Sequence, residues 1–178
     1  DPGPAGFRLC RAAEVAVPPA EQEEDLPAGC QLGYGTWYLC LKGAVLQNYY
    51  PQFGMRQMSD NDVLIDPALA PDVRKYMVAE GYRARGYGVG CHDIYQKDNL
   101  YFEIHRALMS DHNPPPIIQY YENVKERLVT AESGNELRFT NEDFYVYFLA
   151  HAAEHFRAGG LGLRTVLDCY LYRKAKRL

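Results

Sequence analysis

The sequence predicts a protein of the α+β class with a helical section at its C-terminal end. Strand and helix patterns alternate from Trp37 to Arg106, and the run Pro114-Pro115-Pro116 separates them from a section with helical periodicity. The chain has 178 residues, 47% of them hydrophobic, which is enough to bury the core of one domain. We therefore predict an N-terminal arm at residues 1–36, a core at 37–113 and a C-terminal helical section at 114–178.

The first elements of the core lie just after the arm. The arm is rich in Pro, Gly and Glu, which predicts loose packing around one short helix. Trp37 to Leu41 is typical of a buried strand, and Ala44 to Tyr50 has the pattern of a helix that ends at Pro51. Between the two, Gly43 permits a close approach to the backbone, and we expect the helix N-terminus to offer free N–H groups to a phosphate.

Further strands and one helix complete the predicted core. A β-branched run at 63–65 is typical of a strand, and Asp72 to Glu80 fits a helix between Pro71 and Gly81. Residues 82–95 contain two short strands interrupted by glycines. A turn at 96–99 then leads into the strand Leu100 to His105.

Two helices are predicted in the C-terminal section. Thr140 is the N-cap of the first, with Asp143 at its third position, and Gly159-Gly160 ends it after Ala158. The second, at 161–177, ends in a basic run that complements the helix dipole. In this helix Arg164 and Asp168 are spaced for an intrahelical pair. Its apolar stripe consists of Leu163, Val166, Leu167, Tyr170 and Leu171.

Composition and charge exclude several classes of protein. The net charge of −4 argues against a general nucleic-acid-binding protein. The five cysteines include no Cys-x-x-Cys pair, which favours reduced thiols in a cytoplasmic compartment over a disulfide framework or a zinc ribbon. No apolar run approaches the ~18 residues that a membrane helix needs, so we expect no membrane partner.

Three carboxylates are predicted to form a cation site. Asp60 and Asp62 lie two residues apart where a strand begins, and side chains at that spacing point to the same face. Glu103 lies in an apolar strand, where an unpaired carboxylate is unfavourable. If the two strands are neighbours, the three acids share a hard cation such as Mg²⁺. The alternative interpretation of the Asp-x-Asp pair is an acidic turn that opens a strand.

Four residues are candidates for nucleotide binding. Lys42 follows an apolar strand, where a phosphate group would neutralise its charge, and Gly43 lies beside it. Arg56 binds either a triphosphate or Asp60, four residues away. His105 shares the strand face of Glu103 and either orients the reacting groups or is a structural histidine.

Taken in order along the chain, these motifs resemble one known family. The segments LKGAVLQNYYP, DNDVLID, FEIH and HAAEHFRAGGLGLRTVLDCYL, with Arg56 between the first two, are similar to the uncharacterised nucleotidyltransferase family of the polymerase-β-like nucleotidyltransferase superfamily. The resemblance covers Trp37 to Tyr172. It implies a small mixed sheet with flanking helices, a phosphate-facing turn at Lys42 and Gly43, and Mg²⁺ or Mn²⁺ on Asp60, Asp62 and Glu103.

The implied reaction is transfer of a nucleoside monophosphate from an NTP, such as ATP, to an acceptor. Glu103 is the group expected to take the acceptor proton. The acceptor classes that fit are an RNA end, a protein side chain, an aminoglycoside-like small molecule and a sugar phosphate. A toxin-like enzyme that modifies tRNA is a variant within the same class.

A non-catalytic interaction module that keeps this fold is the main rival. Two departures from the family pattern favour it: Asn61 stands between the aspartates, where an apolar residue is usual, and Ala44 follows Gly43, where Gly or Ser is usual. Three crowded carboxylates argue against it, because without a cation they repel one another for no structural benefit.

A zinc hydrolase is the second rival. His151-Ala152-Ala153-Glu154-His155 matches the H-x-x-E-H pattern of inverted zinc peptidases. Such a site needs a third protein ligand, and Asp168 is the sole acidic residue after His155. We therefore expect no tightly bound zinc on these two histidines, which lie instead beside the nucleotide or in the core.

Overall fold

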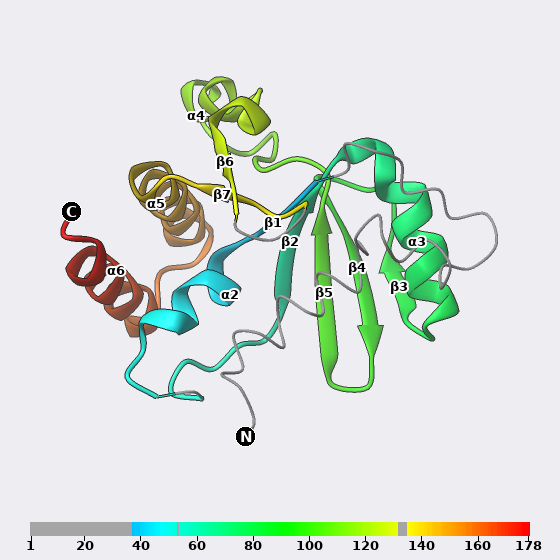
Figure 1. Ribbon diagram of the computed structural model, residues 1–178, viewed down its shortest axis with the longest axis horizontal. Coiled ribbons are helices and arrows are strands. Elements are labelled where there is room, and N and C mark those ends of the chain that lie inside the picture. The colour runs from blue at the N-terminus through cyan, green and yellow to red at the C-terminus, as the bar shows by residue number, and fades with distance from the viewer. Residues whose placement is uncertain (1–36, 53, 132–134) are drawn as a thin grey trace.

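The computed structural model describes residues 37–52, 54–131 and 135–178, so the predicted N-terminal arm lies outside the described residues. The centre of the protein is a five-stranded mixed sheet with the strand order β1-β2-β5-β4-β3 (Figure 1). Only β2 and β5 run parallel, and the other neighbours are antiparallel. The α+β class with a small mixed sheet is thereby confirmed. The strands are β1 (Tyr38–Cys40), β2 (Asn61–Ile65), β3 (Arg83–Gly86), β4 (His92–Lys97) and β5 (Leu100–His105).

The parallel pair β2–β5 determines which side chains meet. In its register Asp62 lies opposite Glu103, and Leu64 lies opposite His105. Because successive side chains of a strand point to opposite faces, these four residues share one face of the sheet. The intervening residues, such as Val63 and Ile104, lie on the other face.

Each face of the sheet is covered by its own apolar cluster. Helix α3 (Ala70–Ala79) packs through Val73 and Met77 against the face of Val63 and Ile104. Helix α5 (Asn141–Ala158) packs through Phe144, Tyr147 and Phe148 against the opposite face. In Figure 1, α3 lies at the β3 end of the sheet, whereas α5 and α6 lie beyond β1. The face of the sheet that carries Asp62 and Glu103 is therefore the face that α5 covers.

Local signals in the sequence account for some of the element ends. The Thr140 Oγ1 accepts a hydrogen bond from the Asp143 backbone N–H at 3.1 Å, so the predicted N-cap of α5 is confirmed. The helix after β1 begins earlier than predicted: α2 (Lys42–Leu46) continues as a 3₁₀ turn at Gln47–Tyr49 before Pro51. A second 3₁₀ turn, Pro67–Leu69, leads into α3 and is capped by Asp66.

The C-terminal section contains a small sheet in addition to its helices. Helix α4 (Pro115–Tyr121) and a 3₁₀ turn at Val124–Arg127 precede strands β6 (Leu128–Thr130) and β7 (Leu137–Phe139). These two strands were not predicted from the sequence. They are only three residues long, and β7 lies next to β1, so its position depends on packing rather than on a long local pattern.

Helix α6 (Leu163–Lys176) packs through a different face from its apolar stripe. Leu163 is 88% exposed and Val166 62% exposed, whereas the buried residues of α6 are Asp168 and Tyr172. Hydrophobic periodicity alone thus indicates the wrong buried face for this helix. Within the described ranges, no helix combines the length and the apolar character needed to span a membrane.

Candidate active site

One cleft contains every site residue that the sequence predicted. It has a volume of about 570 Å³ and lies between the start of β2, the end of β5, α2 and the two C-terminal helices. A larger groove of about 770 Å³ between α5 and α6 has an apolar lining and contains none of these residues. The predicted residues that line the first cleft are Lys42, Gly43, Arg56, Asp60, Asp62, Glu103 and His105.

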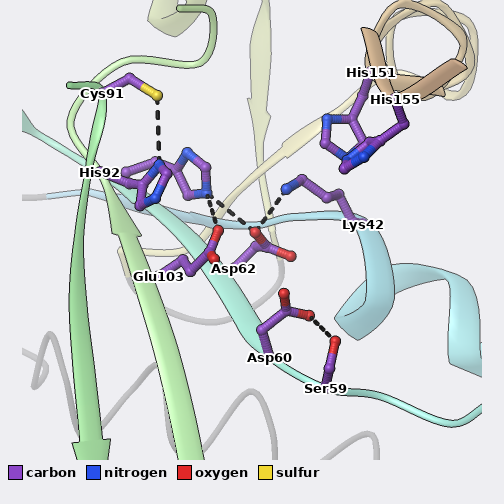
Figure 2. A network of polar contacts seen from close by, with 10 residues as sticks. Lys42, Ser59, Asp60, Asp62, Cys91, His92, Glu103, His151 and His155 are labelled. Carbon is purple, nitrogen blue, oxygen red and sulfur yellow. Dashed lines mark hydrogen bonds and ion pairs between the residues drawn. The ribbon is translucent and has the colours of Figure 1, made fainter. Parts of the chain in front are cut away.

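Asp62 and Glu103 form the acidic centre of this cleft. They lie opposite each other in the parallel pair, and one ligand atom from each lies within 4.8 Å of the other and of a His105 nitrogen. Asp60 lies one residue before β2 and accepts a hydrogen bond from Ser59 at 3.0 Å. Figure 2 shows Asp60 pointing to the same side as Asp62. Within the described residues, the closely spaced group does not extend to Asp60.

A lysine and a histidine hold the Asp62 carboxylate. Lys42 Nζ lies 2.7 Å and His105 Nε2 lies 3.1 Å from Asp62 Oδ1. Burial by itself raises the pKa of Asp62, but the hydrogen bond from His105 and the charge of Lys42 outweigh it and hold that pKa well below its ordinary value. Asp62 is therefore ionised at neutral pH even though it is 4% exposed.

His105 connects both carboxylates of the acidic centre. Its Nε2 lies 3.7 Å from Glu103 Oε2 in addition to its contact with Asp62. Burial lowers the pKa of His105, but the contacts with Asp62, Cys91 and Glu103 prevail and raise it to about 10. The close contact with His105 in turn lowers the pKa of Glu103, although burial opposes this effect. Within the described residues, the imidazole is thus hydrogen-bonded to the Asp62 carboxylate, whereas a bond to the backbone was the structural alternative.

Lys42 and Gly43 form a tight turn between β1 and α2. Lys42 has a φ of 38°, in the left-handed region that side chains disfavour. A Cβ on Gly43 would lie 2.8 Å from Arg56 Nη1 and 3.0 Å from Met58 Cε, so any larger residue would have to displace the guanidinium of Arg56.

Arg56 binds a different acid from the one that its spacing suggested. Its Nε and Nη2 donate to the two Asp168 oxygens, each at 2.9 Å, and Tyr50 donates to Asp168 Oδ1 at 2.7 Å. Arg164 instead donates to the Gln57 carbonyl at 3.0 Å, so it does not form the predicted intrahelical pair with Asp168. The bidentate Arg56–Asp168 pair connects the segment before β2 with α6.

The two histidines of α5 line the cleft but do not have the surroundings of a peptidase zinc site. Their Nε2 atoms lie 2.9 Å apart, and in Figure 2 both rings lie near Lys42. Burial and the charge of Lys42 lower the pKa of His151 to about 3. Glu154 accepts hydrogen bonds from Ser110 and Asn113. Within the described residues, no third ligand joins His151 and His155 in a compact metal-binding group.

The cleft also includes residues that were not predicted from the sequence. Cys91 and His92 lie at the start of β4, and Ser110 follows β5. Cys91 and His92 come close to the acidic centre because of the β4–β5 hairpin, in which His92 is directly opposite His105. A Cys-His dipeptide that leads into a strand was the one local signal available.

Comparisons with known proteins identify relatives of this arrangement. The sequence profile of a family described as uncharacterised nucleotidyltransferase matches residues 33–177. The solution structure of the antibiotic-resistance factor ANT(2'')-Ia is similar with a TM-score of 0.57 at 9% identity, over 95% of this chain and 84% of that one. The crystal structure of ANT(2'')-Ia in complex with adenylyl-2''-tobramycin is similar with a TM-score of 0.55 at 9% identity, over 95% and 89% of the two chains. No curated protein matches the sequence. At this identity, the structural likeness establishes a common fold.

Proposed function

Because this chain belongs to the uncharacterised nucleotidyltransferase family, we propose that it transfers a nucleoside monophosphate from an NTP to an acceptor with the help of a divalent cation. In this proposal Asp60, Asp62 and Glu103 hold Mg²⁺ or Mn²⁺. Lys42, Gly43, Arg56 and His105 form the surroundings of the triphosphate.

The observation that carries this proposal is that Asp62 lies directly opposite Glu103 in the parallel β2–β5 pair. Two carboxylates on neighbouring strands supply hard oxygen ligands from a rigid support, and Asp60 lies where the chain enters β2. This donor set fits Mg²⁺ or Mn²⁺. The depressed pKa of Asp62 keeps its carboxylate ionised for such a role. When bound, the cation supplies charge neutralisation for the triphosphate and the leaving group.

The positions of the side chains around the cleft support a role for each in the reaction. We place the triphosphate against the Lys42-Gly43 turn, where the Lys42 ammonium exchanges part of its contact with Asp62 for a phosphate oxygen. An acceptor oxygen attacks the α-phosphorus, the bond to the β-phosphate breaks and pyrophosphate leaves. The acceptor proton passes to Glu103, whose lowered pKa keeps it ionised before the reaction. The ion pair between Arg56 and Asp168 fixes the segment before β2 against α6 at the side of the cleft.

ANT(2'')-Ia, whose fold is similar, was solved in a complex with adenylyl-2''-tobramycin, so a small molecule that accepts an adenylyl group is one acceptor class that fits this fold. The acceptor classes remain an RNA end, a protein side chain and a small molecule. The assay described next distinguishes these acceptor classes, because label is followed separately into RNA, protein and small molecules.

Labelled nucleotide provides the test. Each of the four NTPs, labelled at the α-phosphate, is incubated with the protein, cell extract and Mg²⁺ or Mn²⁺, and label is followed into RNA, protein and small molecules. We expect transfer with one NTP, and we expect Asp62→Asn to abolish it. Asp111→Asn, the same change at an exposed carboxylate outside the cleft, serves as the matched control.

Nucleotide binding is measured separately by thermal shift with and without MgATP. Wild type and Asp111→Asn should gain stability with the nucleotide, and Asp62→Asn should lose most of that gain. Equal gains in wild type and Asp62→Asn would refute the metal site. Binding with no transfer to any fraction would favour the non-catalytic module.

A further inference from the structure

A second group of ligand atoms lies on the other side of His105 from the carboxylates. Cys91 precedes β4, and His92 and His105 face each other across the β4–β5 pair. Cys91 Sγ lies 3.5 Å from His92 Nδ1, as the dashed line in Figure 2 marks. One ligand atom from each of the three residues lies within 4.8 Å of the other two. The group therefore has the compactness of a metal site.

The buried His105 ring, which belongs to this group, has one nitrogen without a hydrogen-bond partner. His105 is 6% exposed, and its Nδ1 has no hydrogen-bond partner, whereas its Nε2 contacts Asp62 at 3.1 Å. A buried polar atom without a partner is unfavourable and rare, and a bound ion can satisfy such an atom. The orphaned nitrogen is an observation independent of the clustering of Cys91 and His92.

From this arrangement we infer that Cys91, His92 and His105 bind a divalent ion of the zinc type. Thiolate sulfur and imidazole nitrogen select Zn²⁺ or Co²⁺, whereas the carboxylates of Asp62 and Glu103 select Mg²⁺ or Mn²⁺. On binding, the proton of the Cys91 thiol and the proton on His105 Nδ1 leave to solvent, and the ion takes their places. Three protein ligands leave a fourth position for water in a tetrahedral site.

The contact between His105 and Asp62 fits this role. Histidines that bind zinc commonly donate their second ring N–H to a carboxylate, which fixes the ring and its tautomer. Here the Nε2–H of His105 donates to Asp62 while Nδ1 binds the ion. One imidazole would thus connect a soft site to the hard site of the proposed reaction. This inference does not depend on nucleotidyl transfer, because metal binding by the three residues is measurable in a protein without turnover.

Cobalt provides a direct test with the full chain. The protein is purified without a metal-affinity column, stripped with a chelator and titrated with Co²⁺, and a thiolate-to-cobalt charge-transfer band is recorded in the near ultraviolet. We expect one equivalent of Co²⁺ to produce this band in wild type and in Cys169→Ser, and Zn²⁺ to displace it. Cys169→Ser is the matched control because Cys169 lies in α6, away from the group. Cys91→Ser should abolish the band.

A second variant keeps the test valid if Cys91→Ser does not fold. His92→Gln retains the thiolate and should keep the band but weaken Zn²⁺ binding by at least ~10-fold in competition with a chromophoric chelator. His151→Gln should leave both quantities unchanged, since the α5 histidines are outside the group. Absence of the band in wild type, its persistence in Cys91→Ser, or unchanged zinc affinity in His92→Gln would each overturn the inference.

Discussion

The buried pair of Arg56 and Asp168 offers the most quantitative test of this structure. It is bidentate, with both N–O distances at 2.9 Å, and the side chains are 9% and 2% exposed. Tyr50 donates a third hydrogen bond to the same carboxylate, and burial followed by Asp168 raises the pKa of Tyr50 to about 12. Asp168→Asn removes the charge at almost constant volume and leaves the guanidinium buried without a counter-ion.

The expected loss follows from the energetics of a broken buried pair. Removal of one partner costs roughly 3–5 kcal/mol, mainly because the other charge remains desolvated. Since Asn still accepts a hydrogen bond from Tyr50, we expect the lower end, about 3 kcal/mol of unfolding free energy. Arg56→Met should cost a similar amount. The double variant should lose less than the sum, with a coupling energy of about 1.5 kcal/mol or more.

Urea unfolding of the four proteins measures this coupling. The exposed pair Asp72–Lys75 provides the control cycle, because a surface pair contributes only ~0.5 kcal/mol or less. If the losses at Arg56 and Asp168 add to within ~0.5 kcal/mol, the two residues do not act as a buried pair and the reasoning fails.

Three further substitutions test the packing, titration and capping of the cleft and its helices. Gly43→Ala places a Cβ 2.8 Å from Arg56 Nη1 and should cost ~1–3 kcal/mol by urea unfolding, whereas no loss would mean that the turn has free space. Burial lowers the pKa of His151 from 6.5 to about 3, so the unfolded chain takes up the proton first and stability falls as the pH drops below 6.5. His151→Gln should abolish this component, about 2 kcal/mol between pH ~7 and ~5, and an unchanged pH profile would contradict the assignment. Thr140→Ala removes the side-chain oxygen that accepts a hydrogen bond from the Asp143 backbone N–H, and should lower the free energy of unfolding by ~1 kcal/mol. The helical circular dichroism signal should then be lost at a lower temperature than in wild type.

Sequence periodicity was sufficient to mark the acidic residues as candidates, but not to place them next to one another. The spacing of two between Asp60 and Asp62, and the apolar context of Glu103, depend only on strand geometry and on the cost of a buried charge. Both arguments hold whatever the tertiary structure. The parallel alignment of Asp62 with Glu103 could be expected only through the family resemblance, since no local pattern determines which strands become neighbours.

The contacts of Asp168 and His105 show where such reasoning ends. The Arg56–Asp168 pair spans 112 residues, and its acid lies on the face of α6 opposite the apolar stripe that periodicity selects. The Cys91 and His105 group forms only because the β4–β5 hairpin has one particular register. In each case a polar contact in three dimensions decided the outcome, and hydrophobic pattern carries no information about it.

The left-handed backbone of Lys42 has a consequence for how this protein would change under selection. At φ 38° a side chain costs about 1 kcal/mol relative to glycine, yet the Lys42 ammonium lies 2.7 Å from Asp62 in the cleft. Glycine at position 42 would relieve this strain but would leave the buried Asp62 carboxylate without its cation, a loss of roughly 3–5 kcal/mol. A library randomised at position 42 and selected for heat tolerance should therefore retain lysine. The strained backbone at position 42 is therefore maintained by the ion pair that its side chain forms, and replacement of Asp62 by an apolar residue should remove the advantage of lysine over glycine there.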